Sequence, residues 1–421
     1  MSSLMRLRAP AVALSCLAAG LLLDGCGGAS KPQMGTSVKP RTVEKPHPFA
    51  NVQVLAPGPF SGAQFAHFGV NPTVETAEAP ATAFGVVTDT ASFSIARNLL
   101  KAGRMPPAGA IRVEEFVNAF RYDEAPPETE LFAVYAEVLP SPQRQGYHLL
   151  RLALRARETP KQTVAHAVVA TDTPHLPGVR ALISMLQDRV PKVAVVAQDA
   201  GRQAVLDLAM AQASQTGKPG LLVLVSDGRG RRSAEQAAAT RAVAAGHEVV
   251  VVGAGLERVD ELALKAIARS AGGAYHFIAS VPEAQTLAAQ LAAGGGTVAD
   301  DARLQVVFDP KIVSRYRLLG HEGARMPADR FRARGARGGS IAPGATATAL
   351  FELKLTGNAG PLGTLRAHYR TPAGDRRSVE APLRAKRAAT FADASPSARL
   401  AAIAAGFAER LRQAYWARRL E

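Results

Sequence analysis

Two kinds of hydrophobic periodicity divide the chain. Between residues 163 and 296, runs of consecutive apolar residues alternate with segments in which apolar residues recur every three or four positions. Continuous runs predict strands buried on both faces, and recurring positions predict amphipathic helices. The expected strands are 164–170, 193–196, 221–225, 248–252 and 274–278, and the expected helices are 176–186, 203–213, 233–245, 260–270 and 280–293. This alternation predicts an α/β fold with a parallel sheet between two helical layers.

On either side of this region, apolar residues recur at every second position instead. Such alternation predicts strands at 131–139, 147–155, 304–308, 351–355 and 365–369. Helices are expected at 90–100, 111–120 and 392–420. In the last of these, the residues expected to face inward are Leu400, Ile403, Ala404, Phe407 and Leu411. The chain therefore divides into an α+β N-terminal region at 84–160, the α/β domain at 161–298 and a β-rich C-terminal domain with a terminal helix at 299–421.

The first 83 residues have the pattern of a targeting segment followed by a tether. Arg6 and Arg8 precede an apolar stretch at 11–23, which is typical of a bacterial signal peptide at 1–25. Residues 23–26 resemble a lipobox, so we expect cleavage before Cys26 and acylation of that residue. Residues 26–83 are rich in Gly, Ser, Pro, Lys and Thr and predict a flexible tether. An ordinary signal peptide with an incidental cysteine remains the alternative.

This reading places the protein in the bacterial cell envelope, anchored by lipid and facing the periplasm from the outer membrane. Gly27 stands where an Asp would favour retention in the inner membrane. Cys16 lies within the signal, so the mature chain would hold no cysteine except the acylated Cys26. A disulfide and cysteine-ligated zinc are therefore not expected.

The net charge of +15 is concentrated near the C-terminus. Residues 303–421 hold 22 Lys and Arg but only 9 Asp and Glu. These basic residues are not interleaved with aromatics, and the signal directs the chain out of the cytoplasm, so nucleic acid is not an expected partner. A solvated arginine-rich surface is the simplest interpretation. Contact with anionic lipid, lipopolysaccharide, peptidoglycan or an acidic protein remains open.

Candidate chemistry lies at the carboxyl ends of the predicted parallel strands, where such folds bind ligands. Asp172 follows the first strand and Asp227 follows the third, with Arg229, Arg231 and Arg232 just beyond it. The chain has no G-x-S-x-G or H-E-x-x-H motif. Helix-capping roles are expected for two further groups: Asp89 with Thr90, and the pair formed by Ser280 and Glu283.

Several motifs together resemble known proteins. Residues 222–228 and 272–277 resemble strands of von Willebrand factor type A (VWA) domains, which have a Rossmann-like parallel sheet. The segments on either side resemble bacterial YfbK-like lipoproteins. These are residues 84–94, 103–107, 111–120, 306–310, 316–322 and 397–407. The resemblance covers most of residues 84–412.

This resemblance implies a metal-ion-dependent adhesion site that the chain matches incompletely. VWA domains bind a divalent cation through Asp-x-Ser-x-Ser, a Thr from a middle loop and a late Asp. Here Asp172 and Asp227 match, whereas Pro174 and Leu176 occupy the serine positions. We therefore predict a degenerate site without metal or other cofactor. An altered site in which Asp172, Asp199 and Asp227 bind Mg²⁺ remains the alternative.

The predicted function is that of a non-enzymatic interaction or scaffold module. Its partner would be an unidentified envelope protein, bound by Asp172, Asp227, Arg229, Arg231 and Arg232, and no residue is expected to be catalytic. Two alternatives remain. The chain could be an envelope hydrolase that uses the two aspartates, or a basic module that binds lipid or lipopolysaccharide through its C-terminal domain.

Overall fold

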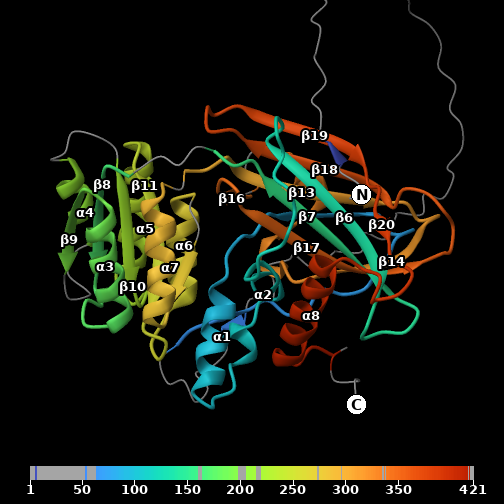
Figure 1. The fold of residues 1–421 in the computed structure, drawn as a ribbon, viewed down its shortest axis with the longest axis horizontal. Coiled ribbons are helices and arrows are strands. Elements are labelled where there is room, and N and C mark those ends of the chain that lie inside the picture. Colours follow the sequence, from blue (N-terminus) through green and yellow to red (C-terminus); the bar gives the residue numbers. More distant parts are fainter. Residues whose placement is uncertain are drawn as a thin grey trace, which may run out of the picture.

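The computed structural model describes residues 5–6, 53–54, 63–159, 164–197, 205–214, 220–272, 275–294, 296–333, 336, 338–415 and 417. They form two bodies that lie side by side in Figure 1, one built on a parallel sheet and one built on antiparallel sheets. Cys26, Asp199 and nearly all of the predicted signal lie outside the described residues.

The parallel-sheet body confirms the α/β prediction. Its five strands run in the order β12-β11-β10-β8-β9, and every pair is parallel. All residues of β8 and β10 are buried, which explains their uninterrupted apolar sequence. The strands are β8 (His166–Thr171), β9 (Lys192–Ala197), β10 (Leu221–Ser226), β11 (Glu248–Ala254) and β12 (Tyr275–Ile278).

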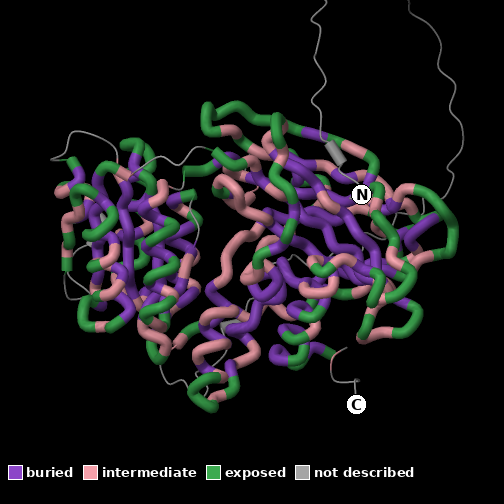
Figure 2. Tube along the Cα trace, in the orientation of Figure 1, coloured by how far each residue is buried: buried purple, intermediate pink, exposed green. Residues whose placement is uncertain are grey.

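Five helices cover the two faces of this sheet. Apolar residues of α3 and α7 pack on one face, and those of α4, α5 and α6 pack on the other. The helices are α3 (Pro177–Arg189), α4 (Val205–Ser214), α5 (Arg232–Ala244), α6 (Glu261–Ser270) and α7 (Val281–Ala292). Figure 2 shows the strands other than the edge strand β9 as a buried layer and the outer helical surfaces as exposed.

The β body contains two sheets that share one core. A seven-stranded sheet has the order β1-β6-β7-β17-β14-β4 with β20 beside β6, and a six-stranded sheet has the order β15-β5-β13-β18-β19 with β16 beside β13. Phe84, Leu150, Val306 and Phe351 lie in the core between the sheets. The strands of the first sheet are β1 (Met5–Arg6), β4 (Val74–Glu75), β6 (Phe132–Pro140), β7 (His148–Ala156), β14 (Val313–Leu319), β17 (Thr346–Leu355) and β20 (Lys386–Arg387). Those of the second are β5 (Ala81–Gly85), β13 (Ala299–Phe308), β15 (Arg325–Met326), β16 (Gly339–Ile341), β18 (Gly363–Arg370) and β19 (Arg376–Pro382).

The two flanks predicted as separate regions form this single body together. Strand β7 of the N-terminal region pairs with β17 of the C-terminal region, and β5 pairs with β13. The tether prediction is wrong for residues 63–83, because β3 (Ala66–His67), β4 and most of β5 lie there. Asn71 is buried in the same segment and donates from Nδ2 to the carbonyl of Leu318 at 3.0 Å. Residues 26–52 and 55–62 of the tether lie outside the described residues, and β2 (Gln53–Val54) pairs with β3.

Helices α2 (Val113–Asn118) and α8 (Pro396–Leu411) cover the β body, and α1 (Ala91–Lys101) lies between the bodies, with Ala91, Ile95 and Leu99 in the core of the parallel sheet. For α8 the predicted inward face is wrong in part. Ile403 is 58% exposed and Phe407 is 47% exposed, whereas Ala401, Ala402 and Ala405 are buried. Alanines fill the buried face of α8, and their small side chains let the helix approach α2 closely. Among the described residues, no helix is long and apolar enough to cross a bilayer.

Two capping predictions also need correction. Thr90 is the N-cap of α1 but makes no side-chain capping bond, and Asp89 accepts from the backbone N–H of Tyr275 at 3.2 Å instead. At α7, Glu283 accepts from the Ala279 N–H at 2.9 Å and from the Ser280 hydroxyl at 3.0 Å. Ser280 makes no side-chain capping bond, so only the glutamate side of the predicted capping box is present, and it is shifted by one residue.

Candidate functional site

The carboxyl edge of the parallel sheet brings Asp172 beside the end of β10. The Ser226 hydroxyl donates to Oδ2 of Asp172 at 2.6 Å and accepts from the backbone N–H of Gly228 at 2.9 Å. Oδ1 of Asp172 is buried and has no hydrogen-bond partner among the described residues. Burial raises the pKa of Asp172 to about 6, with a smaller contribution from the negative charge of Asp227; the Ser226 hydrogen bond opposes both. The Asp172 carboxyl is thus a poorly solvated group, with the Ser226 hydroxyl bonded to its Oδ2.

Asp227 serves mainly to shape the next loop. Its Oδ1 accepts from the N–H of Arg229 at 3.0 Å, and its backbone carbonyl accepts from the N–H of Asp260 at 2.7 Å. Gly228 has φ +81°, and a Cβ there would lie 2.5 Å from the carbonyl oxygen of Asp260. Glycine is therefore required for β10 to turn against the start of α6. Asp260 caps that helix by accepting from the N–H of Ala263 at 2.9 Å.

The arginines predicted to bind a partner lie on the surface of this same edge. Arg229, Arg231 and Arg232 are all exposed, and they lead directly into α5. The Arg229 Nε donates to the carbonyl of Arg258 at 2.8 Å, which joins the loop to the exposed Arg258 in the turn after β11. These exposed arginines outnumber Asp172 and Asp227. The edge is therefore suited to bind an anionic surface of a partner.

The oxygen atoms at this edge do not fit the cation that VWA domains bind. Positions 174 and 176 hold Pro and Leu, which have no side-chain oxygen. The Ser226 hydroxyl is already donated to Asp172, and Thr171 Oγ1 accepts from the N–H of Thr173 at 3.0 Å. In the part of the chain that the structure describes, no three His, Cys, Asp or Glu are grouped to hold a metal ion. A Mg²⁺ ion prefers six oxygen ligands in a regular octahedron, which two carboxylates and engaged hydroxyls do not supply.

Two family models match segments on either side of the parallel-sheet body. A family model described as von Willebrand factor matches residues 59–151, and a model of the C-terminal part of the uncharacterized protein YfbK matches residues 296–363. The uncharacterized protein YfbK of Escherichia coli (strain K12) is 25% identical over 363 residues, which cover 72% of this chain. This chain is similar to YfbK over most of its length, and its match to the von Willebrand factor model ends before the parallel-sheet body begins at β8. It spans 63% of the length of that relative.

Solved structures resemble the YfbK-like chain only distantly. The pilus adhesin SpaC from Lactobacillus rhamnosus GG, in its open conformation, is 9% identical with a TM-score of 0.24, covering 62% of this chain and 48% of SpaC. Three N-terminal domains of the type V pili tip protein Mfa5 from Porphyromonas gingivalis are 10% identical with a TM-score of 0.23, covering 62% of this chain and 78% of that one. Similarity at this level carries no functional information.

Sequence reasoning missed a buried group of charges between the two bodies of the YfbK-like chain. We call it the interface cluster, and its members are Asp89, Arg112, Glu114, Glu115, Glu261 and Lys265. Arg112 donates from Nη2 to Glu261 Oε2 at 3.0 Å and from Nη1 to the carbonyls of Gly109 and Ala66 at 2.9 and 3.1 Å. Lys265 of α6 pairs with Glu115 of α2 and lies 3.1 Å from Glu261 Oε1. The only sequence signal was the density of charges within the apolar pattern of 111–120.

The charged groups of the interface cluster shift one another's pKa values. Burial, together with repulsion from Glu115, raises the pKa of Asp89 to about 7. The pKa of Glu115 is lowered, because the nearby cations Lys265 and Arg112 outweigh the effect of burial. Glu114 accepts from the backbone N–H of His321 at 2.9 Å, which connects α2 to the end of β14. The cluster therefore joins α2, α6 and β14 by directional contacts.

Proposed function

We propose that this YfbK-like protein is a non-enzymatic interaction module that binds an acidic partner protein at the carboxyl edge of its parallel sheet. The supporting observation is the exposed row of Arg229, Arg231 and Arg232 beside a site that lacks the oxygen ligands of a VWA cation site. In VWA domains with a cation, the metal supplies positive charge for a partner carboxylate. In this chain the guanidinium groups would supply that charge directly.

A direct test compares the wild-type protein with the triple variant Arg229→Glu, Arg231→Glu and Arg232→Glu. A photo-crosslinking residue at Pro174, which is exposed at the same edge, should capture a partner in envelope preparations. The purified partner should then bind the wild type, and the triple variant should bind at least 10-fold more weakly. A matched control carries the same reversal at the exposed residues Arg376, Arg377 and Arg384 of the β body. Equal loss in both variants would show general charge attraction and exclude the sheet edge as the binding site.

We also propose that the module is attached to the envelope membrane through Cys26, at the outer membrane facing the periplasm. Metabolic labelling with a radioactive fatty acid should mark the wild type and leave Cys26→Ser unlabelled. Label on both proteins, or on neither, would refute acylation at Cys26.

Two rival functions have their own outcomes. If the aspartates support hydrolysis, then wild-type protein should cleave generic esters or phosphoesters, and Asp172→Asn with Asp227→Asn should not. If the basic C-terminal region binds lipid or lipopolysaccharide, then liposome binding should fall steeply with salt. That experiment needs the whole chain, because β13 and β17 pair with β5 and β7 and a fragment from residue 303 would lose both partners.

A further inference from the structure

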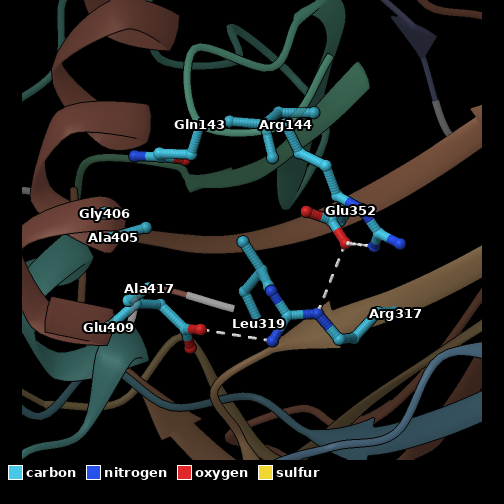
Figure 3. Close-up of a pocket in the computed structure, with 10 residues that line it drawn as sticks. Gln143, Arg144, Arg317, Leu319, Glu352, Ala405, Gly406, Glu409 and Ala417 are labelled. Atoms are coloured by element: carbon cyan, nitrogen blue, oxygen red, sulfur yellow. Dashed lines mark hydrogen bonds and ion pairs between the residues drawn. The ribbon is translucent and has the colours of Figure 1, made fainter. Parts of the chain in front are cut away.

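A cavity of about 240 Å³ lies beside α8 in the β body and shares no lining residue with the sheet edge. In Figure 3 the side chains of Gln143, Arg317, Glu352 and Glu409 surround the space next to Ala405 and Gly406 of α8. Leu149 of β7 and Leu319 of β14 supply apolar wall. The cavity thus combines a few converging polar groups with aliphatic surface, which is the usual composition of a small-ligand site.

The charged wall of the cavity is buried and balanced. The side chains of Arg317, Glu352 and Glu409 are 4%, 6% and 8% exposed. Arg317 donates from Nη1 to Glu409 Oε2 at 3.2 Å, and Arg144 donates from Nη1 to Glu352 Oε2 at 2.8 Å. Two cations thus face two anions. A ligand with a net charge would add an uncompensated charge to this enclosure, which is costly.

Hydrogen-bonding capacity in the cavity is left unused. Nε of Arg317 faces Glu352 Oε2 at 3.5 Å and is closed off from the cavity by burial, so the capacity lies in the other atoms of this pair. Arg317 uses only Nη1 of its two terminal nitrogens, and Glu352 uses only Oε2 of its two oxygens, for contacts with described residues. One strong donor and one strong acceptor therefore remain for a ligand that carries both kinds of group.

Gly406 of α8 leaves room for the side chain of Gln143, which is the remaining polar group of the cavity. A Cβ at Gly406 would lie 1.8 Å from Nε2 of Gln143, so the Gln143 amide rests directly on the helix backbone. Glycine in a helix interior costs about 1 kcal/mol relative to alanine. The close approach of Gln143 explains why glycine occurs at position 406. The same approach places the amide donor and acceptor of Gln143 beside the cavity.

We propose that this cavity binds a small zwitterion, a free amino acid or a dipeptide. Its carboxylate is held by Arg317 and Gln143, its ammonium group by Glu352, and its apolar side chain lies against Leu149 and Leu319. The volume is below the range of about 300–1,000 Å³ that holds drug-sized ligands, which fits a molecule of this size. The equal numbers of cations and anions in the wall select a ligand of zero net charge.

The test is calorimetric titration of the full chain with alanine, leucine, Ala-Ala and Ala-Leu. The same ligands with an acetylated amino group or an amidated carboxyl group, together with glucose and inorganic phosphate, complete the set. At least one zwitterion should bind saturably, and capping either end should weaken binding at least 10-fold. No saturable binding at 10 mM by any zwitterion, or tighter binding of phosphate, glucose or a capped ligand, would overturn the proposal.

Variants separate the cavity from other surfaces. Gln143→Ala should weaken binding about 10-fold, as expected for a lost hydrogen bond to a carboxylate. Glu352→Gln preserves the shape of the side chain, and it should abolish the preference for a free over an acetylated amino group. The control is Gln285→Ala on the exposed face of α7, which should bind like the wild type. Unchanged binding by Gln143→Ala, with circular dichroism confirming that each variant is folded, would place the ligand elsewhere.

Discussion

Removing the Arg112 guanidinium should destabilise the protein far more than removing an exposed arginine at the same interface. In Arg112→Met the interface cluster keeps the carboxyls of Asp89, Glu114, Glu115 and Glu261, with Lys265 as the remaining cation within it. The Glu261 side chain is only 1% exposed, so water cannot replace the lost partner. Two backbone carbonyls, those of Ala66 and Gly109, also lose their donor.

The size of the effect follows from this burial. Breaking a buried ion pair by removing one partner costs about 3–5 kcal/mol, because the other charge is left without compensation. The free energy of unfolding, measured by urea titration with circular dichroism at 222 nm, should fall by about that amount. The assay should be run at pH 8, where the carboxyls of the cluster carry their largest negative charge.

The matched control is Arg104→Met. Arg104 pairs with Glu257 across the same two bodies, but the two side chains are 36% and 60% exposed. Water and salt screen such pairs, so the control should unfold like the wild type. If Arg112→Met lowers stability no more than Arg104→Met does, the interface cluster does not hold the bodies together.

Three further predictions address stability. The free energy of unfolding should fall as the pH rises from about 4 to about 7, because Asp89 in the folded protein keeps a proton that the unfolded carboxyl has already lost. In urea titrations at several pH values, Asp89→Asn should reduce this dependence of the unfolding free energy on pH. Gly228→Ala should lower the free energy of unfolding by about 1–3 kcal/mol, since its φ is +81° and the new Cβ would meet Asp260, whereas Gly230→Ala, with open space around its Cβ, should be nearly neutral. Ala402→Leu on the buried face of α8 should cost about 1–3 kcal/mol by overpacking, and Ile403→Ala on the exposed face should change stability by less than about 0.5 kcal/mol; the reverse order in thermal unfolding would restore the face expected from the sequence.

The parallel-sheet body was the most predictable part of the chain, because the hydrophobic periodicity of each segment matches the burial that the fold gives it. Residues 221–225 were expected to form a strand, and β10 spans Leu221–Ser226 with every residue buried. The helix expected at 260–270 is α6, which begins at Glu261 after the cap Asp260. Strands that are buried on both faces must be apolar throughout, and helices between them must repeat every 3.6 residues, so the sequence pattern carries the fold directly.

The misassignments share a physical origin in long-range packing. Residues 81–85 became a strand because β13 and β15 offer hydrogen-bond partners on both sides, and composition does not reveal partners that lie more than 200 residues away. In α8, the apolar pattern could not distinguish the alanine face from the face with Ile403 and Phe407, because both are hydrophobic. Positions 172 and 227 were predicted to lie at one sheet edge, and they do. The hydroxyl that bonds Asp172 belongs to Ser226, which lies in the matched segment 222–228 but was given no role at the site.

The interface cluster connects the two segments matched by family models to the parallel-sheet body that lies between them in the sequence. Arg112 and Glu114 belong to the first matched segment, His321 and Glu322 belong to the second, and Glu261 belongs to the parallel-sheet body between them. The three segments meet because His321 donates to Glu114, Arg112 pairs with Glu261, and Glu322 is close enough to raise the pKa of Arg112. Each contact is directional, so a substitution in either flank would leave a buried charge in the other segments. At the sheet edge the described contact of the Asp172 carboxyl is local, because Pro174 and Leu176 have no side-chain oxygen and the Ser226 hydroxyl donates to one oxygen of Asp172.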